Sequence, residues 1–513
     1  MYINNKILVG KSDKKDLGIL LDKANRHGLI TGASGSGKTI TLKVMAESFS
    51  DSGVPVFLAD VKGDLAGCAL EGEIDENIAS RLKKLGIKDF DSKSYPVRFW
   101  DLYGEYGHPI RTKISDVGPL ILSIMLGLSE AQEGVLDICF KIAKDEELDL
   151  VDLKDLRSAL QYIGDNRKDY ITKYGNITTG SIGVIQRSLL TLENQGADNF
   201  FGEPSLDIKD FIRLDDSNRG YINILHAVKL FNNPDLYASF LLWILTEMFN
   251  TMPEVGDLAK PKIVFFFDEA HLLFNGMPSY RLKQITQIVK LIRSRGIGLY
   301  FISQGPTDIP DEILGQLGNR VQHTLRAYTP SEQKTVKAAA NAFRINPNFN
   351  TEEAILNLGT GEALISFQNE KGEPEVVEKA TILPPQSKIG TIDDLMRNKI
   401  INNSEFAGKY DESVDNISAY EKVTQKYEEE IKLKEEIEKK KQEEKNAKEL
   451  EKQKLAEEKA LAREKREQEK AEKEAERARK NNPAYKIGKK VVNKSVDKVI
   501  NKGLNAIFKN LFK

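Results

Sequence analysis

The segment HGLITGASGSGKTITL, at residues 27–42, restricts the fold of this chain more than any other feature. Gly32 to Thr39 fit the pattern G-x-x-x-x-G-K-[ST], after an apolar run that ends at Ile30 and before a helical pattern. Such a loop works only between a strand and a helix, because backbone N–H groups and the positive end of the helix must converge on one anion. We therefore expect an α/β fold with a phosphate-binding loop.

The residues of this loop have separate predicted tasks. The glycines let backbone N–H groups surround a phosphate chain, the ammonium group of Lys38 reaches the β- and γ-phosphate oxygens, and the hydroxyl of Thr39 holds Mg²⁺. A glycine-rich turn without a ligand is the alternative, and both flanking elements argue against it. The predicted nucleotide-binding residues are Gly32, Ala33, Ser34, Gly35, Ser36, Gly37, Lys38, Thr39 and Ile40.

An acidic pair follows an apolar run in the segment IVFFFDEAH. Such a run predicts a strand buried on both faces, and ligands of open parallel sheets bind at the carboxyl ends of the strands. We predict that Asp268 holds Mg²⁺, directly or through water, and that Glu269 orients and deprotonates the attacking water. The pair favours hydrolysis over mere binding, although acidic residues are also common at ordinary helix N-termini.

Other polar residues follow further predicted strands. Gln304, at the end of LYFISQ, is a candidate sensor of the γ-phosphate or the water, with a simple polar strand end as the alternative. Phosphoryl transfer gains from an arginine that neutralises transition-state charge, supplied in cis or by another polypeptide. The candidates are Arg293, Arg295, Arg320 and Arg326, and for each one alone a solvated or salt-bridged side chain is the simpler explanation.

A third group of charged residues lies in FLADVKGDLAG. Asp60, Lys62 and Asp64 come just after a predicted strand, on the edge where open sheets bind ligands. They either couple the nucleotide state to motion or form a plain turn, and the residues alone leave both alternatives open.

The order of the predicted elements indicates how the chain is organised. Apolar runs bounded by turn residues alternate with helical patterns such as YASFLLWILTEMF, which predicts an α/β domain with a mainly parallel sheet. We assign residues 1–109 and 202–385 to this core. Helical patterns dominate residues 110–201, and we interpret that region as a helical insertion.

The composition changes after Pro384 and Pro385, and we expect a linker at 386–420. Residues 421–480 are almost entirely Glu, Lys, Arg, Gln and Ala, without a sustained heptad, so an isolated charged helix and a coiled coil both stay open. Residues 481–513 combine lysines with apolar residues at helical spacing. This basic amphipathic tail is predicted to contact an anionic membrane, a nucleic acid or a protein partner, or to dock on its own protein.

Charge and cysteine content limit the class of protein. The net charge of −2 combines a basic tail with an acidic remainder, which argues against a core that binds nucleic acid over its whole surface but allows a local basic channel. Cys68 and Cys139 have no CxxC spacing, so neither a disulfide framework nor a zinc site is indicated. No apolar run reaches the roughly 18 residues of a membrane span, and we expect a cytoplasmic protein.

A family resemblance is carried by five segments: ANRHGLITGASGSGKT, VPVFLADVKGDLAG, FFFDEAHLLF, FISQGPTDIP and LGNRVQHTLRA. Together they resemble a bacterial branch of the HerA/FtsK superfamily, the HerA-like helicase C-terminal domain proteins, over most of residues 1–385. The resemblance implies a RecA-like core, ATP hydrolysis in a hexameric ring, and translocation on double-stranded DNA. It also favours Arg293 as a finger that acts across a subunit boundary, because this residue precedes GIG much as the matching arginine does in HerA proteins.

Two other classes of function stay open. The first is an ATP-driven switch or scaffold that acts on a protein partner or a membrane surface, with the charged helix and basic tail as its interaction arm. The second is a small-molecule kinase, against which the adjacent Asp268 and Glu269 and the lack of an evident acceptor-binding lid both count.

Overall fold

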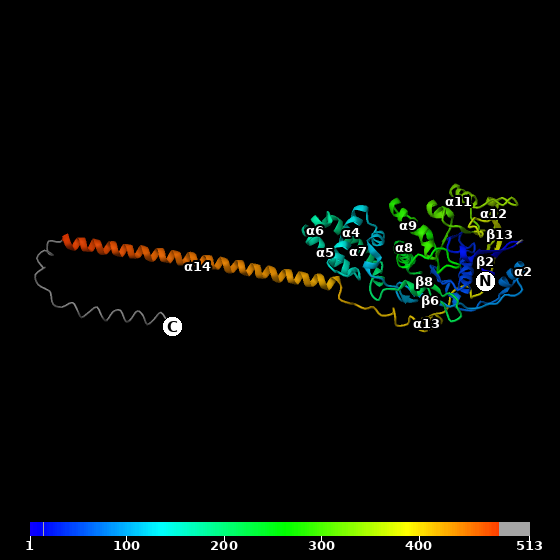
Figure 1. Cartoon of the computed structure of the whole chain (residues 1–513), viewed down its shortest axis with the longest axis horizontal. Helices are drawn as coiled ribbons and strands as arrows, with labels where there is room; N and C mark the ends of the chain where they lie inside the picture. The colour runs from blue at the N-terminus through cyan, green and yellow to red at the C-terminus, as the bar shows by residue number, and fades with distance from the viewer. Residues whose placement is uncertain (14, 482–513) are drawn as a thin grey trace. The chain divides into compact units, whose positions relative to one another are not determined.

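The computed structural model describes residues 1–13 and 15–481. The chain divides into two compact units, of which the first is Met1–Thr424 and the second starts at Gln425 (Figure 1). The basic tail predicted for 481–513 lies, from residue 482 onward, outside the described residues, so its amphipathic helix stays a prediction.

A mixed sheet forms the centre of the first unit. The strand order is β1-β2-β13-β12-β11-β4-β10-β9-β5-β8-β6-β7, with β3 paired to β2. From β11 to β7 neighbouring strands pair in parallel, and from β1 to β11 they pair antiparallel, which confirms the predicted mainly parallel sheet. The strands are β1 Tyr2–Ile3, β2 Lys6–Lys11, β3 Asp16–Leu20, β4 Gly28–Thr31, β5 Val56–Asp60, β6 Val97–Asp101, β7 His108–Pro109, β8 Ile222–His226, β9 Ile263–Phe267, β10 Ile297–Ser303, β11 Asn319–Gln322, β12 Glu362–Ser366 and β13 Glu378–Ile382.

The parallel strands are buried on both faces, which explains the unbroken apolar runs in the sequence. On one face, the ring of Phe49 lies 6.3 Å from that of Phe266 and 5.9 Å from that of Tyr300. On the other face, the ring of Phe265 lies 5.2 Å from that of Phe57. Because side chains alternate along a strand, neighbouring phenylalanines of β9 enter two different parts of the core.

Helices surround this sheet and fill the insertion. Residues 110–201 contain helices α3 to α7 and no described strand, and α4, α5 and α7 pack on one another (Figure 1). The helices are α1 Lys38–Asp51, α2 Glu76–Leu85, α3 Ile114–Met125, α4 Glu130–Asp145, α5 Leu153–Asp165, α6 Arg167–Tyr174, α7 Thr179–Asn194, α8 Pro234–Thr251, α9 Ser279–Leu291, α10 Asp311–Leu314, α11 Pro330–Asn341, α12 Thr351–Leu356, α13 Asp394–Asn402 and α14 Ala419–Asn481.

The segment 386–420, for which the sequence suggested a linker, packs against the sheet domain instead. It forms helix α13, and its aromatic residues Phe406 and Tyr410 are each only 1% exposed. The ring of Phe406 lies 5.4 Å from that of Trp100, and the hydroxyl of Tyr410 donates a hydrogen bond of 2.6 Å to Asp210. These isolated aromatic residues show no helix or strand period, so the sequence pattern did not reveal the packing.

The charged segment forms one long helix, α14, from Ala419 to Asn481. This confirms the predicted charged helix, whereas its pairing in a coiled coil stays a prediction. Its apolar residues Ile431, Leu433, Ile437, Leu450, Leu455 and Leu461 are all exposed. Within the described part of the chain, no helix combines the length and the apolarity that crossing a membrane requires.

Candidate nucleotide-binding site

The phosphate loop, Gly32–Thr39, connects β4 to α1 as predicted. Gly35 and Gly37 have φ angles of 76° and 115°, in the left-handed region that favours glycine. At Gly32, a Cβ atom would lie 2.5 Å from the Cβ of His323, so only glycine fits. Gly37 also caps α1, and the free N–H groups of the first helical turn therefore face the loop.

Lys38 is folded back over the loop. Its ammonium group donates hydrogen bonds to the backbone oxygens of Gly32 (2.6 Å) and Ala33 (3.2 Å). Burial lowers the pKa of Lys38, and the nearby carboxylates of Glu269 and Asp268 act in the opposite direction. The lysine and the two acids predicted from separate parts of the sequence therefore meet in one place.

Asp268 follows β9, which lies between β10 and β5 in the parallel part of the sheet. Burial and the neighbouring Glu269 carboxylate raise the pKa of Asp268 to about 6. Its Oδ1 accepts a hydrogen bond of 2.9 Å from the backbone N–H of Glu269, and Tyr237 donates to its backbone oxygen at 2.8 Å. The carboxylate is thus held at the carboxyl edge of the sheet, where the phosphate loop also lies.

Glu269 occupies a strained position at the end of the same strand. Its φ angle of 49° lies in the left-handed region, which is uncommon for a residue with a side chain. Its buried Oε2 accepts no hydrogen bond within the described residues, and the Nδ1 atom of His271 lies 3.3 Å from it. A buried carboxylate oxygen without a donor has free capacity to accept one from a bound molecule.

Gln304 leaves the sheet beside the phosphate loop. Strand β10 pairs in parallel with β4, with Ser303 opposite Thr31, so Gln304 and Gly32 follow the two strands side by side. Exposed Gln304 lines a cavity of about 330 Å³ together with Ala33, Ser34 and Arg326. The structure therefore brings Gln304 and one of the four candidate arginines to the loop.

Two other candidate arginines are held by their own chain. Arg320 donates to the backbone oxygens of Leu314 at 2.9 Å and Ala342 at 3.2 Å. Arg295 donates to the backbone oxygen of Met252, and its guanidinium lies 4.4 Å from the ring of Phe249. Both side chains serve the local structure.

Arg293 lies at the opposite edge of the sheet from the phosphate loop. It precedes β10, and its backbone oxygen accepts a hydrogen bond of 3.4 Å from Asn25, which precedes β4. Because β4 and β10 are parallel, their amino ends share one edge and the phosphate loop follows the other edge. The exposed Arg293 is therefore separated from the nucleotide site of its own chain by the length of the sheet strands.

The charged residues after β5 divide between two tasks. Asp60 forms a turn, because its carboxylate accepts hydrogen bonds from the backbone N–H groups of Gly63 (2.7 Å) and Leu65 (3.0 Å). Lys62 and Asp64, carried on this turn, line a cavity of about 360 Å³ that also contains Lys38, Thr39 and Ile40. Asp60 thus shapes the turn, and the coupling of nucleotide state to motion stays a prediction for Lys62 and Asp64.

With this geometry described, one family match decides the assignment. The family model described as Helicase HerA-like C-terminal matches residues 5–509, which is nearly the whole chain. This chain belongs to that family. The membership confirms the resemblance carried by the sequence motifs, and the phosphate loop between β4 and α1 places this HerA-like protein among the P-loop ATPases.

Two curated relatives match parts of this HerA-like chain. A protein of Methanocaldococcus jannaschii named "Probable helicase MJ1565" is 30% identical over 156 residues, which cover 30% of this chain and 29% of the relative. The "DNA double-strand break repair helicase HerA" of Sulfolobus acidocaldarius is 28% identical over 171 residues, which cover 32% of this chain and 33% of the relative. The matched regions thus span about a third of each relative.

Solved structures with a similar chain course include a plasmid coupling protein and a VirB4 protein. The coupling protein TrwB, in complex with a non-hydrolysable ATP analogue, matches with a TM-score of 0.48 and 12% sequence identity. The match covers 72% of this chain and 87% of the TrwB chain. VirB4 of Thermoanaerobacter pseudethanolicus matches with a TM-score of 0.44 and 14% sequence identity. The match covers 77% of this chain and 99% of the VirB4 chain.

A histidine that the sequence analysis missed supports the phosphate loop of this HerA-like protein. The imidazole of His323, which is 0% exposed, lies 2.9 Å from the hydroxyl of Thr41 and 3.0 Å from the backbone oxygen of Glu362. Burial lowers the pKa of His323 to about 4, so the ring is neutral at pH 7. It ties α1 to strands β11 and β12, and its only sequence signal was a polar residue directly after a short strand.

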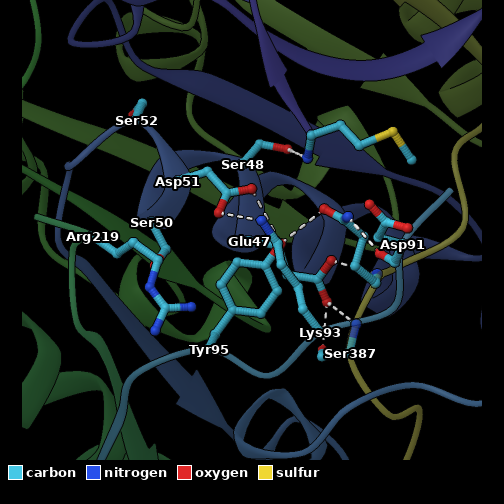
Figure 2. A network of polar contacts seen from close by, with 12 residues as sticks. Glu47, Ser48, Ser50, Asp51, Ser52, Asp91, Lys93, Tyr95, Arg219 and Ser387 are labelled. Atoms are coloured by element: carbon cyan, nitrogen blue, oxygen red, sulfur yellow. Dashed lines mark hydrogen bonds and ion pairs between the residues drawn. The ribbon is translucent and has the colours of Figure 1, made fainter. Parts of the chain in front are cut away.

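The back of helix α1 holds a second polar network (Figure 2). The carboxylate of Glu47, which is 1% exposed, accepts hydrogen bonds from the backbone N–H groups of Gln386 (2.7 Å) and Ser387 (3.2 Å) and from the Ser387 hydroxyl. On the same helix, Asp51 forms an ion pair of 2.7 Å with Lys93. The helix that presents the phosphate loop is therefore fastened to the segment 386–420.

The residues at this site fit a magnesium ion that is shared with phosphate. Mg²⁺ takes oxygen ligands and is bound through one or two protein oxygens plus phosphates, without an all-protein cage. Thr39 and Asp268 supply such oxygens, and the Oε2 of Glu269, which accepts no hydrogen bond within the described residues, gives the site a further acceptor. Within the described residues there is no cluster of three or more acidic, histidine or cysteine side chains that could hold a metal ion.

Proposed function

We propose that this protein is a Mg²⁺-dependent ATPase that assembles into a hexameric ring and translocates on double-stranded DNA. The observation that carries the proposal is the convergence of Lys38, Asp268 and Glu269 at one edge of the sheet, since they arrive from two distant segments. A binding protein would need the loop and the lysine alone. Glu269, whose Oε2 accepts no hydrogen bond within the described residues, adds what hydrolysis requires, a group that accepts a proton from water.

Each residue has a task in this proposal. The backbone N–H groups of the phosphate loop and the ammonium group of Lys38 hold the β- and γ-phosphates of ATP. Thr39 and Asp268 hold Mg²⁺, which when bound neutralises charge on the phosphate oxygens. Glu269 orients a water molecule and takes its proton, and Gln304 contacts the γ-phosphate or this water.

A ring would complete the site from outside the chain. Arg293 is exposed at the edge of the sheet away from its own phosphate loop, and within one chain it has no route to the nucleotide. An arginine in this position neutralises transition-state charge only in the site of a neighbouring subunit. Assembly and turnover should therefore be linked, so that dilution below the assembly concentration lowers turnover per chain, whereas a small-molecule kinase would work as a monomer.

Co-expression of two inactive variants tests this trans arrangement. Arg293→Ala and Glu269→Gln each lack one half of the composite site, and each alone is expected to lose at least about tenfold in turnover, because a trans arginine contributes about 10³–10⁵ in well-studied cases. Mixed rings contain interfaces where an intact Glu269 meets an intact Arg293. Co-expression of the two variants should therefore restore a measurable part of the ATP turnover.

The matched control is co-expression of Lys38→Ala with Glu269→Gln. Lys38 and Glu269 come from the same chain in each site. Every site in these mixed rings therefore lacks one of the two residues, and a neighbouring subunit cannot replace it. If the Arg293→Ala pair is no more active than this control pair, or if Arg293→Ala alone keeps wild-type turnover, the trans assignment is wrong.

DNA is proposed as the track on the strength of the family. The family description and the names of both curated relatives include the word helicase. The scaffold alternative would instead place the interaction in the charged helix and the basic tail. Deletion of residues 482–513 separates the two: a DNA motor keeps duplex-stimulated turnover, whereas a scaffold loses partner capture while basal turnover is unchanged.

A further inference from the structure

The turn after β5 presents a second lysine to the phosphate loop. The carboxylate of Asp60, which is 1% exposed, accepts hydrogen bonds from three backbone N–H groups of the turn, those of Gly63, Asp64 and Leu65. Gly63 has a φ angle of 77°, which a residue with a side chain rarely adopts. The backbone that carries Lys62 is therefore fixed in position before any nucleotide binds.

The sheet register places this turn next to the acidic pair. Strand β5 pairs in parallel with β9, with Leu58 opposite Phe266, so the residues after the two strands lie at the same edge. Lys62 lines one cavity of about 360 Å³ together with Lys38 and Thr39. The exposed side chain of Lys62 lines this cavity. Within the described residues, no carboxylate forms an ion pair with it.

The charged side chains at this edge of the sheet interact with one another. The Lys62 ammonium group interacts electrostatically with the Asp268 carboxylate and with the Lys38 ammonium group. Two lysines on different elements thus approach the same acidic residue from two sides. Asp268 and Glu269 follow β9, which lies between the two lysine-bearing elements in the sheet order. The two lysines therefore concentrate positive charge beside the acidic pair, where a bound nucleotide would carry its terminal phosphate.

We propose that Lys62 binds the γ-phosphate of ATP from the side opposite Lys38. This inference rests on the proposed ATPase function and deepens it by naming a residue that distinguishes ATP from ADP. Lys38 reaches both the β- and the γ-phosphate, so it contributes to the binding of either nucleotide. Lys62 lies on the turn after β5, the strand that neighbours β9 and its acidic pair, and would lose its partner when the γ-phosphate leaves.

Equilibrium binding of ATPγS and ADP to the full-length Lys62→Ala variant tests the proposal. ATPγS affinity is expected to fall about tenfold or more, since hydrogen bonds between charged groups are stronger than those between neutral groups. ADP affinity should stay within about twofold, and Lys62→Arg should retain most of the ATPγS affinity. Lys371→Ala, an exposed lysine in the turn between β12 and β13 and outside this cavity, is the matched control and should leave both affinities unchanged.

The outcomes separate this inference from the ATPase proposal. An unchanged ATPγS affinity, or an equal loss for ATPγS and ADP, overturns the assignment of Lys62 even if the wild-type protein hydrolyses ATP. A wild-type protein that does not hydrolyse ATP contradicts the proposed function instead. Because the Lys62 side chain is exposed, the variant should unfold at the same temperature as the wild-type protein. A loss of affinity for ATPγS alone would then reflect a lost contact with the nucleotide and not a change in folding.

Discussion

Replacement of Glu269 by glutamine is expected to lower the turnover number for ATP by about 10²–10⁴-fold, the range for loss of a general base. Glutamine has nearly the same shape but cannot take a proton from water. ATP affinity should stay within about twofold, because the phosphate loop and Lys38 lie on other elements. Steady-state hydrolysis and equilibrium ATP binding, measured on the same preparation, provide the two numbers.

Asp64→Asn is the informative comparison for this variant. Asp64 carries a carboxylate that lines the cavity beside Lys38 and Thr39, and it lies on the turn after β5. Its oxygens would compete with Glu269 for the task of proton acceptor. If Asp64→Asn abolishes turnover while Glu269→Gln leaves it intact, the base is on the β5 turn and the assignment of Glu269 is wrong.

Replacement of Glu47 by alanine should have the largest effect on stability among the residues described. Its buried carboxylate accepts three hydrogen bonds from Gln386 and Ser387, and all three donors would lose their acceptor. We expect a loss of about 3 kcal/mol or more in the free energy of unfolding, since each buried unsatisfied donor costs about 1–3 kcal/mol. Urea-induced unfolding, followed by the tryptophan fluorescence of the sheet domain, measures this loss.

Lys93→Ala is the matched control for the stability experiment. It removes the ion pair with Asp51 on the same helix, but the Lys93 side chain is 37% exposed, and exposed pairs contribute only about 0.2–1 kcal/mol. Glu47→Ala should therefore be clearly less stable than Lys93→Ala. Equal losses in the two variants would mean that the contact between α1 and the segment after Pro385 does not stabilise the domain.

The backbone geometry of the candidate site could be predicted where the local sequence determines it. Residues 32–39 combine glycines that need left-handed backbone with a lysine at the start of a helix, so strand, loop and helix could be assigned together. The convergence of Asp268 with this loop was also predictable, because parallel strands bring their carboxyl ends to one edge. The long charged helix followed from composition alone.

Contacts between distant segments could not be predicted in the same way. Glu47 and Ser387 are 340 residues apart and neither lies in a recognisable motif. His323 looked like a polar residue at a strand end, and only the fold shows that Thr41 and Gly32 lie against it. The packing of residues 386–420 rests on single aromatic residues without a period, so its polar composition suggested a linker.

Steady-state ATP hydrolysis with and without double-stranded DNA, at two salt concentrations, tests the central proposal most directly, with Lys38→Ala as the blank. We predict turnover well above the blank, stimulation by the duplex, and a smaller stimulation at the higher salt concentration, because neutralised phosphates release counterions on binding. Turnover that exceeds the blank but is indifferent to DNA at both salt concentrations would contradict the DNA motor and favour an ATPase that acts on a protein or a membrane.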